Sequence, residues 1–278
     1  MPAPAPVDRI SDAIGHTPVV RLARAAGGAD VRVKLEPRSP SAGYADRVAS
    51  ELMRLVRPQR GSQVTMGGDG ELEVGVARAL REHGARLKSH LPESASIEVR
   101  QSLKALGVEL ALTPHAEGVV GAMTRAGESK LPLLDAIEAA NTQLAQELAQ
   151  TIKADGGNCG AIVIGGVQYF GFVPQLERDG LKAPVLAASL PSGRAVHRLA
   201  GLVAEDFVHE GMAVLVDDRF GWGWRERLAK EEGLLLSPAA AAIVGVAIEH
   251  AQKHPSAPVY AVATDTGERF FSLKDTFS

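Results

Sequence analysis

The stretch QVTMGGDGELEVGVARALREHGARLKSHLPESASIEVRQSLKALGVELAL, residues 63–112, decides the fold class. Its short apolar runs at 63–66, 87–91 and 108–112 predict strands, and the longer runs 73–83 and 96–106 have the spacing of amphipathic helices. Strands that alternate with helices of this length are typical of a parallel sheet with crossover helices. The stretch therefore predicts an α/β fold.

The same alternation continues on both sides of this stretch. Strands are predicted at 31–35, 160–164, 184–189 and 259–263, and helices at 46–56, 134–154, 219–232 and 239–250. The repeating block from about 40 to 130 is followed by a more strongly apolar half. We therefore predict two domains: a smaller αβ domain at 40–130, inserted into a larger α/β domain made of 1–39 plus 131–278.

Charge and composition exclude several classes of function. Thirty Lys and Arg against thirty-three Asp and Glu give a net charge of −3, and aromatic residues make up 4%. A chain this balanced has neither the basic patch nor the stacking rings that nucleic-acid binding needs, and no cationic face for a membrane. The single cysteine, Cys159, excludes an intramolecular disulfide and a cysteine-based metal centre. We expect a cytoplasmic protein without a metal site.

Few motifs indicate chemistry on their own. The glycine-rich turn at 67–70 precedes a helix and could bind an anion, but Glu71 and Glu73 bring negative charge to it, which favours a plain turn. The pair Gly165 and Gly166, after a buried strand, is the better candidate for a phosphate-binding turn. His250 and His254 stand at a helix end before a proline, which favours a surface helix terminus over a metal site.

Several stretches, taken in order, carry a resemblance to a known family. They are Ile10-Ser-Asp-Ala-Ile-Gly-His-Thr-Pro-Val-Val-Arg-Leu22, Val33-Lys-Leu-Glu36, Pro40-Ser-Ala-Gly-Tyr-Ala-Asp-Arg47, Leu91-Pro-Glu-Ser-Ala-Ser-Ile-Glu-Val-Arg100 and the runs 227–235 and 264–270. Together they resemble the cysteine synthase and cystathionine β-synthase family of fold-type-II pyridoxal phosphate enzymes. The resemblance implies a two-domain, tryptophan synthase β-like fold, with parallel sheets flanked by helices.

The resemblance also places the family's site motifs on this chain. Ala45 stands where the family's K-D-R motif has the lysine that binds the cofactor, and a methyl group cannot form that bond. Gly68, Asp69, Gly70 and Glu71 match the family's substrate loop. Glu71 stands where that loop has the asparagine that contacts the cofactor ring. Positions matching the remaining cofactor contacts are Gly165 and Gly166 of the phosphate cup, Ser237 of the pyridine contact and the segment 201–205. We expect Ala45, Gly70 and Gly165 to surround one cleft.

The retained scaffold and the altered site motifs support one main hypothesis. The chain is interpreted as a cysteine-synthase-like pseudoenzyme with no covalently bound cofactor, whose cleft binds a small metabolite or a partner protein. The alternative is a pyridoxal phosphate-dependent β-replacement or β-elimination enzyme acting on an O-activated serine, in which Ala45 is an engineered lysine-to-alanine change. A cofactor-independent acid–base catalyst is a third alternative, for which no complete acid–base pair is evident. The family resemblance further implies a homodimer.

Overall fold

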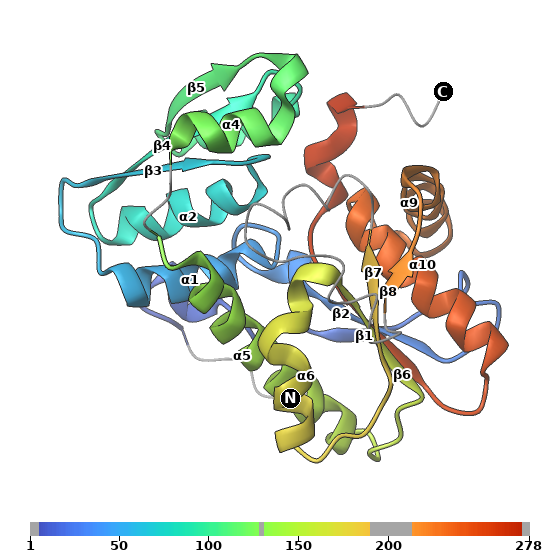
Figure 1. Cartoon of the computed structure of the whole chain (residues 1–278). Coiled ribbons are helices and arrows are strands. Elements are labelled where there is room, and N and C mark those ends of the chain that lie inside the picture. Colours follow the sequence, from blue (N-terminus) through green and yellow to red (C-terminus); the bar gives the residue numbers. More distant parts are fainter. Residues whose placement is uncertain (1–5, 128–130, 190–212, 274–278) are drawn as a thin grey trace.

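Two β-sheets with helices around them form the computed structural model, which describes residues 6–127, 131–189 and 213–273 (Figure 1). The large sheet has the strand order β1-β2-β9-β6-β7-β8, and the small sheet has the order β3-β4-β5. The small sheet comes from a single stretch of sequence, whereas the strands of the large sheet come from both sides of it. This arrangement agrees with the predicted α/β class, while the domain bounds at 40 and 130 stay a prediction.

The large sheet is parallel except at its first strand. Its strands are β1 (Val19–Arg21), β2 (Val31–Leu35), β6 (Ala161–Gly165), β7 (Val185–Ser189), β8 (Ala213–Leu215) and β9 (Val259–Ala263). Strand β9 lies between β2 and β6, with Ala261 opposite both Val33 and Val163. All five residues of β9 are buried, as expected for a parallel strand that helices cover on both faces.

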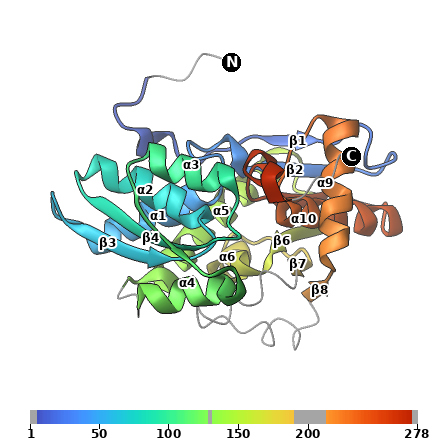
Figure 2. The ribbon, with the colours of Figure 1, turned by 90° about the horizontal axis from the view of Figure 1, so that it is seen from above.

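Helices cover the two faces of the large sheet in pairs. On β6, Ile162 and Ile164 point toward the side of α5 (Leu133–Ala154) and α6 (Tyr169–Arg178). Ala161 and Val163 point toward α9 (Asp218–Glu232) and α10 (Pro238–Lys253). The alternation follows from the two-residue period of a strand, and the view from above separates the two helix layers (Figure 2).

The small sheet is a compact parallel unit. It consists of β3 (Gln63–Gly67), β4 (Arg86–Pro92) and β5 (Glu109–Thr113), with α2 (Glu71–Glu82), α3 (Ile97–Ala105) and α4 (Gly118–Ala126) packed on it. Helix α1 (Ala45–Val56) packs on both α2 and α5. The buried residues of the small sheet therefore continue into the core on the α5 side of the large sheet.

Five short 3-10 helices complete the described chain: η1 (Ile10–Ala13), η2 (Glu36–Arg38), η3 (His115–Glu117), η4 (Gly166–Gln168) and η5 (Gly267–Leu273). The last of them reaches back to the small sheet's helices, where the Ser272 hydroxyl donates to Glu98 Oε2 at 2.6 Å. In Figure 1 this red segment stands between α10 and the small sheet. The end of the described chain therefore joins the two sheets.

Helix α10 is buried along most of its length, and α9 and strands β2, β6, β7 and β9 cover it. Its apolar surface is therefore satisfied within the chain and gives no separate evidence for a dimer. No helix among the described residues has the length and apolar character needed to cross a membrane.

Candidate functional site

The N-terminus of α1 carries Ala45 to the C-terminal end of the large sheet. The Tyr44 N–H donates to Thr264 O at 2.7 Å, directly after β9 ends, and Gly43 forms a bridge with Asp265. Ala45 is the first helical residue and is partly exposed. The position therefore lies where ligands bind in open parallel sheets, as expected.

A chain of hydrogen bonds connects this helix end to the turn after β6. The Tyr44 hydroxyl donates to Asn141 Oδ1 at 2.5 Å, and the Asn141 side-chain amide donates to Val167 O at 2.9 Å and Phe170 O at 2.7 Å. The flank of Ala45 and the turn that begins at Gly165 are therefore held together through α5. Neither Asn141 nor Tyr44 was identified from the sequence.

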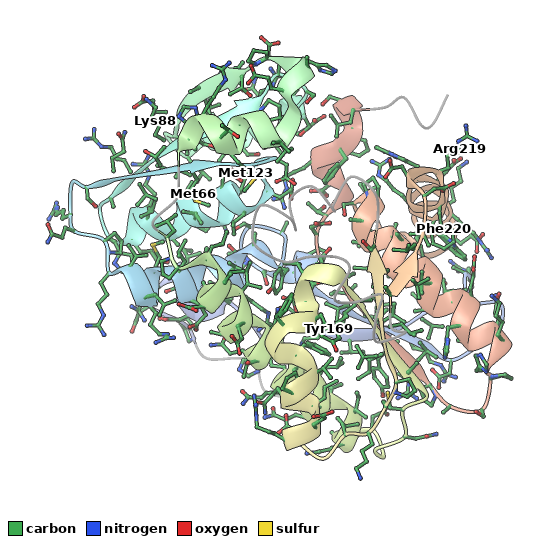
Figure 3. The ribbon with its side chains drawn as sticks, viewed as in Figure 1. Met66, Lys88, Met123, Tyr169, Arg219 and Phe220 are labelled. Carbon is green, nitrogen blue, oxygen red and sulfur yellow. The ribbon has the colours of Figure 1, made fainter. Side chains whose placement is uncertain are left out.

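The side chain of Gln168 fills the turn that the sequence predicted to bind phosphate. Gln168 is only 1% exposed, and its Oε1 lies 2.5 Å from where a Cβ on Gly165 would stand. Gly166 is buried beneath the same turn. The rings of Tyr169 and Phe170 follow, edge to face at 6.0 Å, and Figure 3 shows Tyr169 at the start of α6. The Gln168 amide oxygen therefore lies against the first residue of this turn, and two aromatic rings follow it.

The N-terminus of α2 binds the chain's own carboxylates. The Gly70 N–H donates to Glu73 Oε2 at 3.1 Å, and the Glu71 N–H donates to Asp69 Oδ1 at 3.0 Å. Gly70 has φ +99°, and a Cβ there would overlap the Val99 side chain, so this turn requires glycine. The amides to which an anionic ligand would bind are therefore already hydrogen-bonded within the chain.

The second oxygen of Glu73 is buried without a hydrogen-bond partner among the described residues. The residue is 1% exposed, and burial raises the pKa of its carboxyl to about 8. Loss of hydration disfavours the charged form, and the nearby Asp69 charge acts in the same direction.

An ion pair closes the other side of the loop at 68–71. The Arg269 guanidinium, on η5, contacts Glu71 Oε2 at 2.7 Å and donates to Ser41 O at 2.6 Å. The side chains of Arg269 and Glu71 are only 9% and 18% exposed. Arg269 therefore connects the start of α2 to the loop before α1. It was not predicted as a site residue from the sequence.

Ser237 caps a helix. Its hydroxyl accepts from the Ala240 N–H at 3.1 Å as the N-cap of α10, and its backbone N–H donates to Asp265 O at 3.4 Å. One Asp265 oxygen is buried without a partner among the described residues, and burial raises the pKa of this carboxyl to about 6. The position that matches the family's pyridine contact thus faces a carboxylate.

The lysines nearest in sequence do not replace the missing amine. Lys34 is 1% exposed, and its Nζ lies 2.9 Å from Glu147 Oε2 within a buried network. Arg47, which matches the family's K-D-R arginine, holds Glu36 and Glu147 in the same network. Lys88 pairs with Glu109. Figure 3 shows Lys88 at the outer side of the small sheet.

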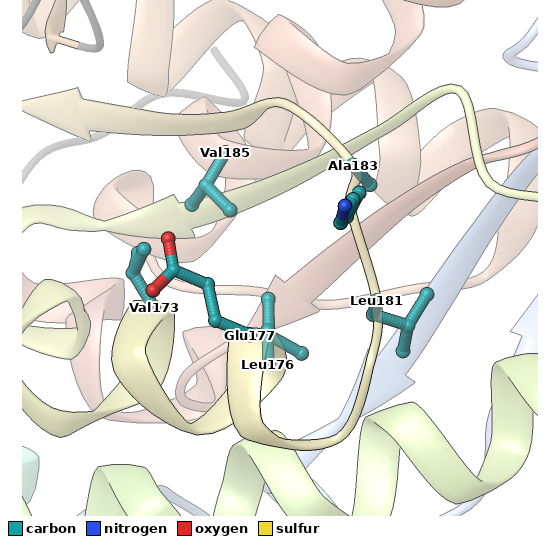
Figure 4. Close-up of a pocket in the computed structure, with 7 residues that line it drawn as sticks. Val173, Leu176, Glu177, Leu181, Ala183 and Val185 are labelled. Carbon is teal, nitrogen blue, oxygen red and sulfur yellow. The ribbon is translucent and has the colours of Figure 1, made fainter.

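Neither of two cavities among the described residues is lined by Ala45, Gly70 or Gly165. One, of about 350 Å³, lies between the end of α6 and the start of β7 (Figure 4). It is at the amino end of the strand, opposite to the edge where parallel sheets bind ligands. The other, of about 380 Å³, lies beside η1, α1 and α2. No group of three or more metal-ligating side chains occurs among the described residues.

Comparison with known proteins establishes the family. The family model described as "Pyridoxal-phosphate dependent enzyme" matches residues 10–172. The chain belongs to this family. The resemblance inferred from the sequence motifs is confirmed.

Relatives cover almost the whole chain. It is 29% identical over 307 residues to a probable cysteine synthase of Bacillus subtilis, with 96% of both chains covered. It is 29% identical over 304 residues to a cysteine synthase of Staphylococcus aureus, again with 96% of both covered.

Solved structures of this pyridoxal-phosphate dependent family share the fold. The O-acetylserine dependent cystathionine beta-synthase from Helicobacter pylori has a TM-score of 0.82 at 21% identity, covering 99% of this chain and 100% of that one. O-acetyl serine sulfhydrylase isoform 3 from Entamoeba histolytica has a TM-score of 0.83 at 20% identity, covering 100% and 93%. The predicted fold-type-II architecture is confirmed.

The site residues do not fit the family's cofactor. Position 45 offers no amine, Gln168 lies against Gly165 in the turn after β6, and the carboxylate of Asp265 is close to Ser237. The orphaned oxygens of Glu73 and Asp265 are acceptors, whereas a phosphate or a substrate carboxylate requires donors. The segment 201–205, which the sequence also matched to the site, lies outside the described residues.

Proposed function

We propose that this protein is a cysteine-synthase-like member of its family that does not carry out pyridoxal phosphate chemistry and uses its cleft to bind a small metabolite or a partner protein. One observation carries the proposal: the groups at the positions of the family's anion and cofactor contacts are bonded to the chain's own side chains. The Gly70 and Glu71 amides bind Glu73 and Asp69, and Arg269 binds Glu71. Each bond between a ligand and a charged group that is lost in this way is worth about 1.5–3 kcal/mol.

The second candidate is a pyridoxal phosphate-dependent β-replacement enzyme acting on an O-activated serine. The relatives favour it, because chains named cysteine synthase match over 96% of this sequence. It requires that Ala45 be an engineered change from lysine and that the self-bonded groups open for the cofactor. The two candidates differ in what a lysine at position 45 would restore.

The deciding experiment returns that lysine. Ala45→Lys, Ala45→Lys with Glu71→Asn, and the unchanged protein are incubated with the cofactor and desalted. Retained cofactor is then measured by visible absorbance, and sulfide addition to O-acetylserine is assayed. Ala23→Lys, a lysine at an exposed alanine, controls for nonspecific reaction of the cofactor with surface amines.

Our proposal expects no turnover and no more retained cofactor in Ala45→Lys than in Ala23→Lys. Partial recovery only when Glu71→Asn is added would still support it, because this would locate the defect in the loop as well as at position 45. Turnover by Ala45→Lys alone, at the rate of an ordinary cysteine synthase, would refute it and establish the enzyme.

Assembly and location belong to the same proposal. We infer a cytoplasmic homodimer, and the dimer rests on the family resemblance alone, because the apolar surface of α10 is covered within the chain. Light scattering at micromolar concentration tests the dimer, and a mass of 29.2 kDa would refute it.

A further inference from the structure

Four arginines are among the thirteen residues that line the second cavity. It has a volume of about 380 Å³, at the lower end of the roughly 300–1,000 Å³ typical of small-molecule sites. Small residues of α1 and α2 leave the space open, among them Ser50, Gly75 and Ala79. The side chains that bring positive charge to its wall are Arg9, Arg54, Arg57 and Arg78, with His83 beside them.

The carboxylates around the cavity are already occupied. Asp46 accepts from the Ser41 N–H and hydroxyl, and Glu82 accepts from the Ser11 N–H at 2.8 Å. Outside the lining, Asp12 pairs with Arg9 and Glu51 pairs with Arg54. Each acidic group therefore has a donor before any ligand arrives.

Two arginines have no such counterpart. Among the described residues, no side-chain hydrogen bond or ion pair holds the guanidinium of Arg57, which is exposed, or that of Arg78, which is half-buried and acts on Asp46 only through its charge. Arginines that lose hydration usually gain a hydrogen-bonded partner, and Arg78 has none of these bonds. The cavity thus presents two guanidinium groups whose N–H donors are not hydrogen-bonded to the described residues.

Arg57 occupies a backbone position that favours glycine. It ends α1 in the left-handed conformation, with φ 47° and ψ 62°, where helices most often have glycine. A side chain in this conformation costs about 1 kcal/mol relative to glycine. The chain therefore places a long cationic side chain at the cavity where a smaller residue would be more stable.

We propose that the cavity formed by η1, α1 and α2 binds a phosphate group, either as the free ion or as the phosphate ester of a small metabolite, between Arg57 and Arg78. Two planar guanidinium groups suit the tetrahedral oxygens of phosphate. Arg54 can add the guanidinium nitrogens that do not donate to Glu51. The site is separate from the family's cleft but close to it. Gly75 lines the cavity, and a Cβ on Gly75 would stand 3.2 Å from the Ala45 Cβ.

The test is isothermal titration of the full chain with inorganic phosphate and, in a second arm, with glycerol 3-phosphate, at ionic strength matched by sodium chloride. The variants are Arg57→Gly, Arg78→Gln and the control Arg227→Gln, which removes an exposed arginine of α9 that pairs with Glu231. Arg57→Gly is the informative change, because it should leave thermal stability equal or higher while removing a ligand contact.

We expect saturable phosphate binding that weakens at least tenfold in Arg57→Gly and in Arg78→Gln and does not change in Arg227→Gln. Tighter binding of glycerol 3-phosphate would identify the ester as the ligand class, and equal or weaker binding would identify the free ion. Three results would overturn the proposal: no saturable binding in either arm, equal affinity in Arg57→Gly, or an equal loss in Arg227→Gln.

Discussion

Replacing Glu73 with glutamine should make the protein more stable at neutral and alkaline pH. The folded protein raises the pKa of Glu73 from 4.5 to about 8, because the carboxyl is buried with one oxygen unpaired. A raised carboxyl pKa contributes stability that is fully present below pH 4.5 and is lost as the pH rises toward 8. The loss amounts to about 1.4 kcal/mol per pH unit for one proton, or roughly 3 kcal/mol between about pH 5.5 and 7.5.

Glutamine keeps the capping bond from the Gly70 N–H and cannot ionise. Urea unfolding of the unchanged protein and of Glu73→Gln, measured across that pH range, gives the difference in unfolding free energy. We expect this difference to grow in favour of the variant by about 3 kcal/mol as the pH rises. Glu93→Gln, at an exposed glutamate in the small sheet's part of the chain, is the control. Parallel curves for the two proteins would refute the raised pKa and the burial argument behind it.

Two other buried charges give further predictions. Arg269→Met breaks the ion pair with Glu71. This should lower the free energy of unfolding by about 1–3 kcal/mol, since both partners are mostly buried but still reach solvent. If the double mutant with Glu71→Gln lost as much stability as the two single mutants added together, the pairing would be contradicted. Hydrogen bonds from Arg47 and Lys34 outweigh burial and lower the pKa of Glu147 to about 2, so its stabilisation is present above its ordinary pKa and disappears as the pH falls through 2. Glu147→Gln should therefore lower the free energy of unfolding by about 1–3 kcal/mol at pH 7, after allowing for partial exposure, and by little at pH 2. Urea unfolding measures both values, and an equal loss of stability at the two pH values would exclude this account.

The fold was predictable because its elements are long and periodic. Strand β9 lies at the predicted residues 259–263, and α5 differs from its prediction by one residue at its start. Of the elements that were not predicted, three were missed for local reasons. Strands β1 and β8 have only three residues each, at the two edges of the sheet, and α4 begins at Gly118, a poor helix former with φ +55°.

The contacts around the candidate site could not be predicted from the sequence. Motif order predicted that Ala45, Gly70 and Gly165 share one cleft, and this stays a prediction, although hydrogen bonds through Asn141 join the flank of Ala45 to the turn after β6. The partners that close the site are distant in sequence: Arg269 meets Glu71 across 198 positions, and Tyr44 meets Asn141 across 97. No local pattern identifies such pairs, because they depend on how the two sheets face each other.

The order of strands in the large sheet has a consequence for synthesis on the ribosome. Strand β2 is made long before its parallel neighbour β9, because Val31 pairs with Val259. The small sheet needs only residues 63–113 and can form early, since closing short loops costs little entropy. Until β9 is made, β2 and β6 expose unpaired apolar edges, the kind of surface that chaperones bind and that aggregates form on. A chain that stops before Val259 would leave the large sheet in two separate pieces, β1-β2 and β6-β7-β8, with no strand to join them.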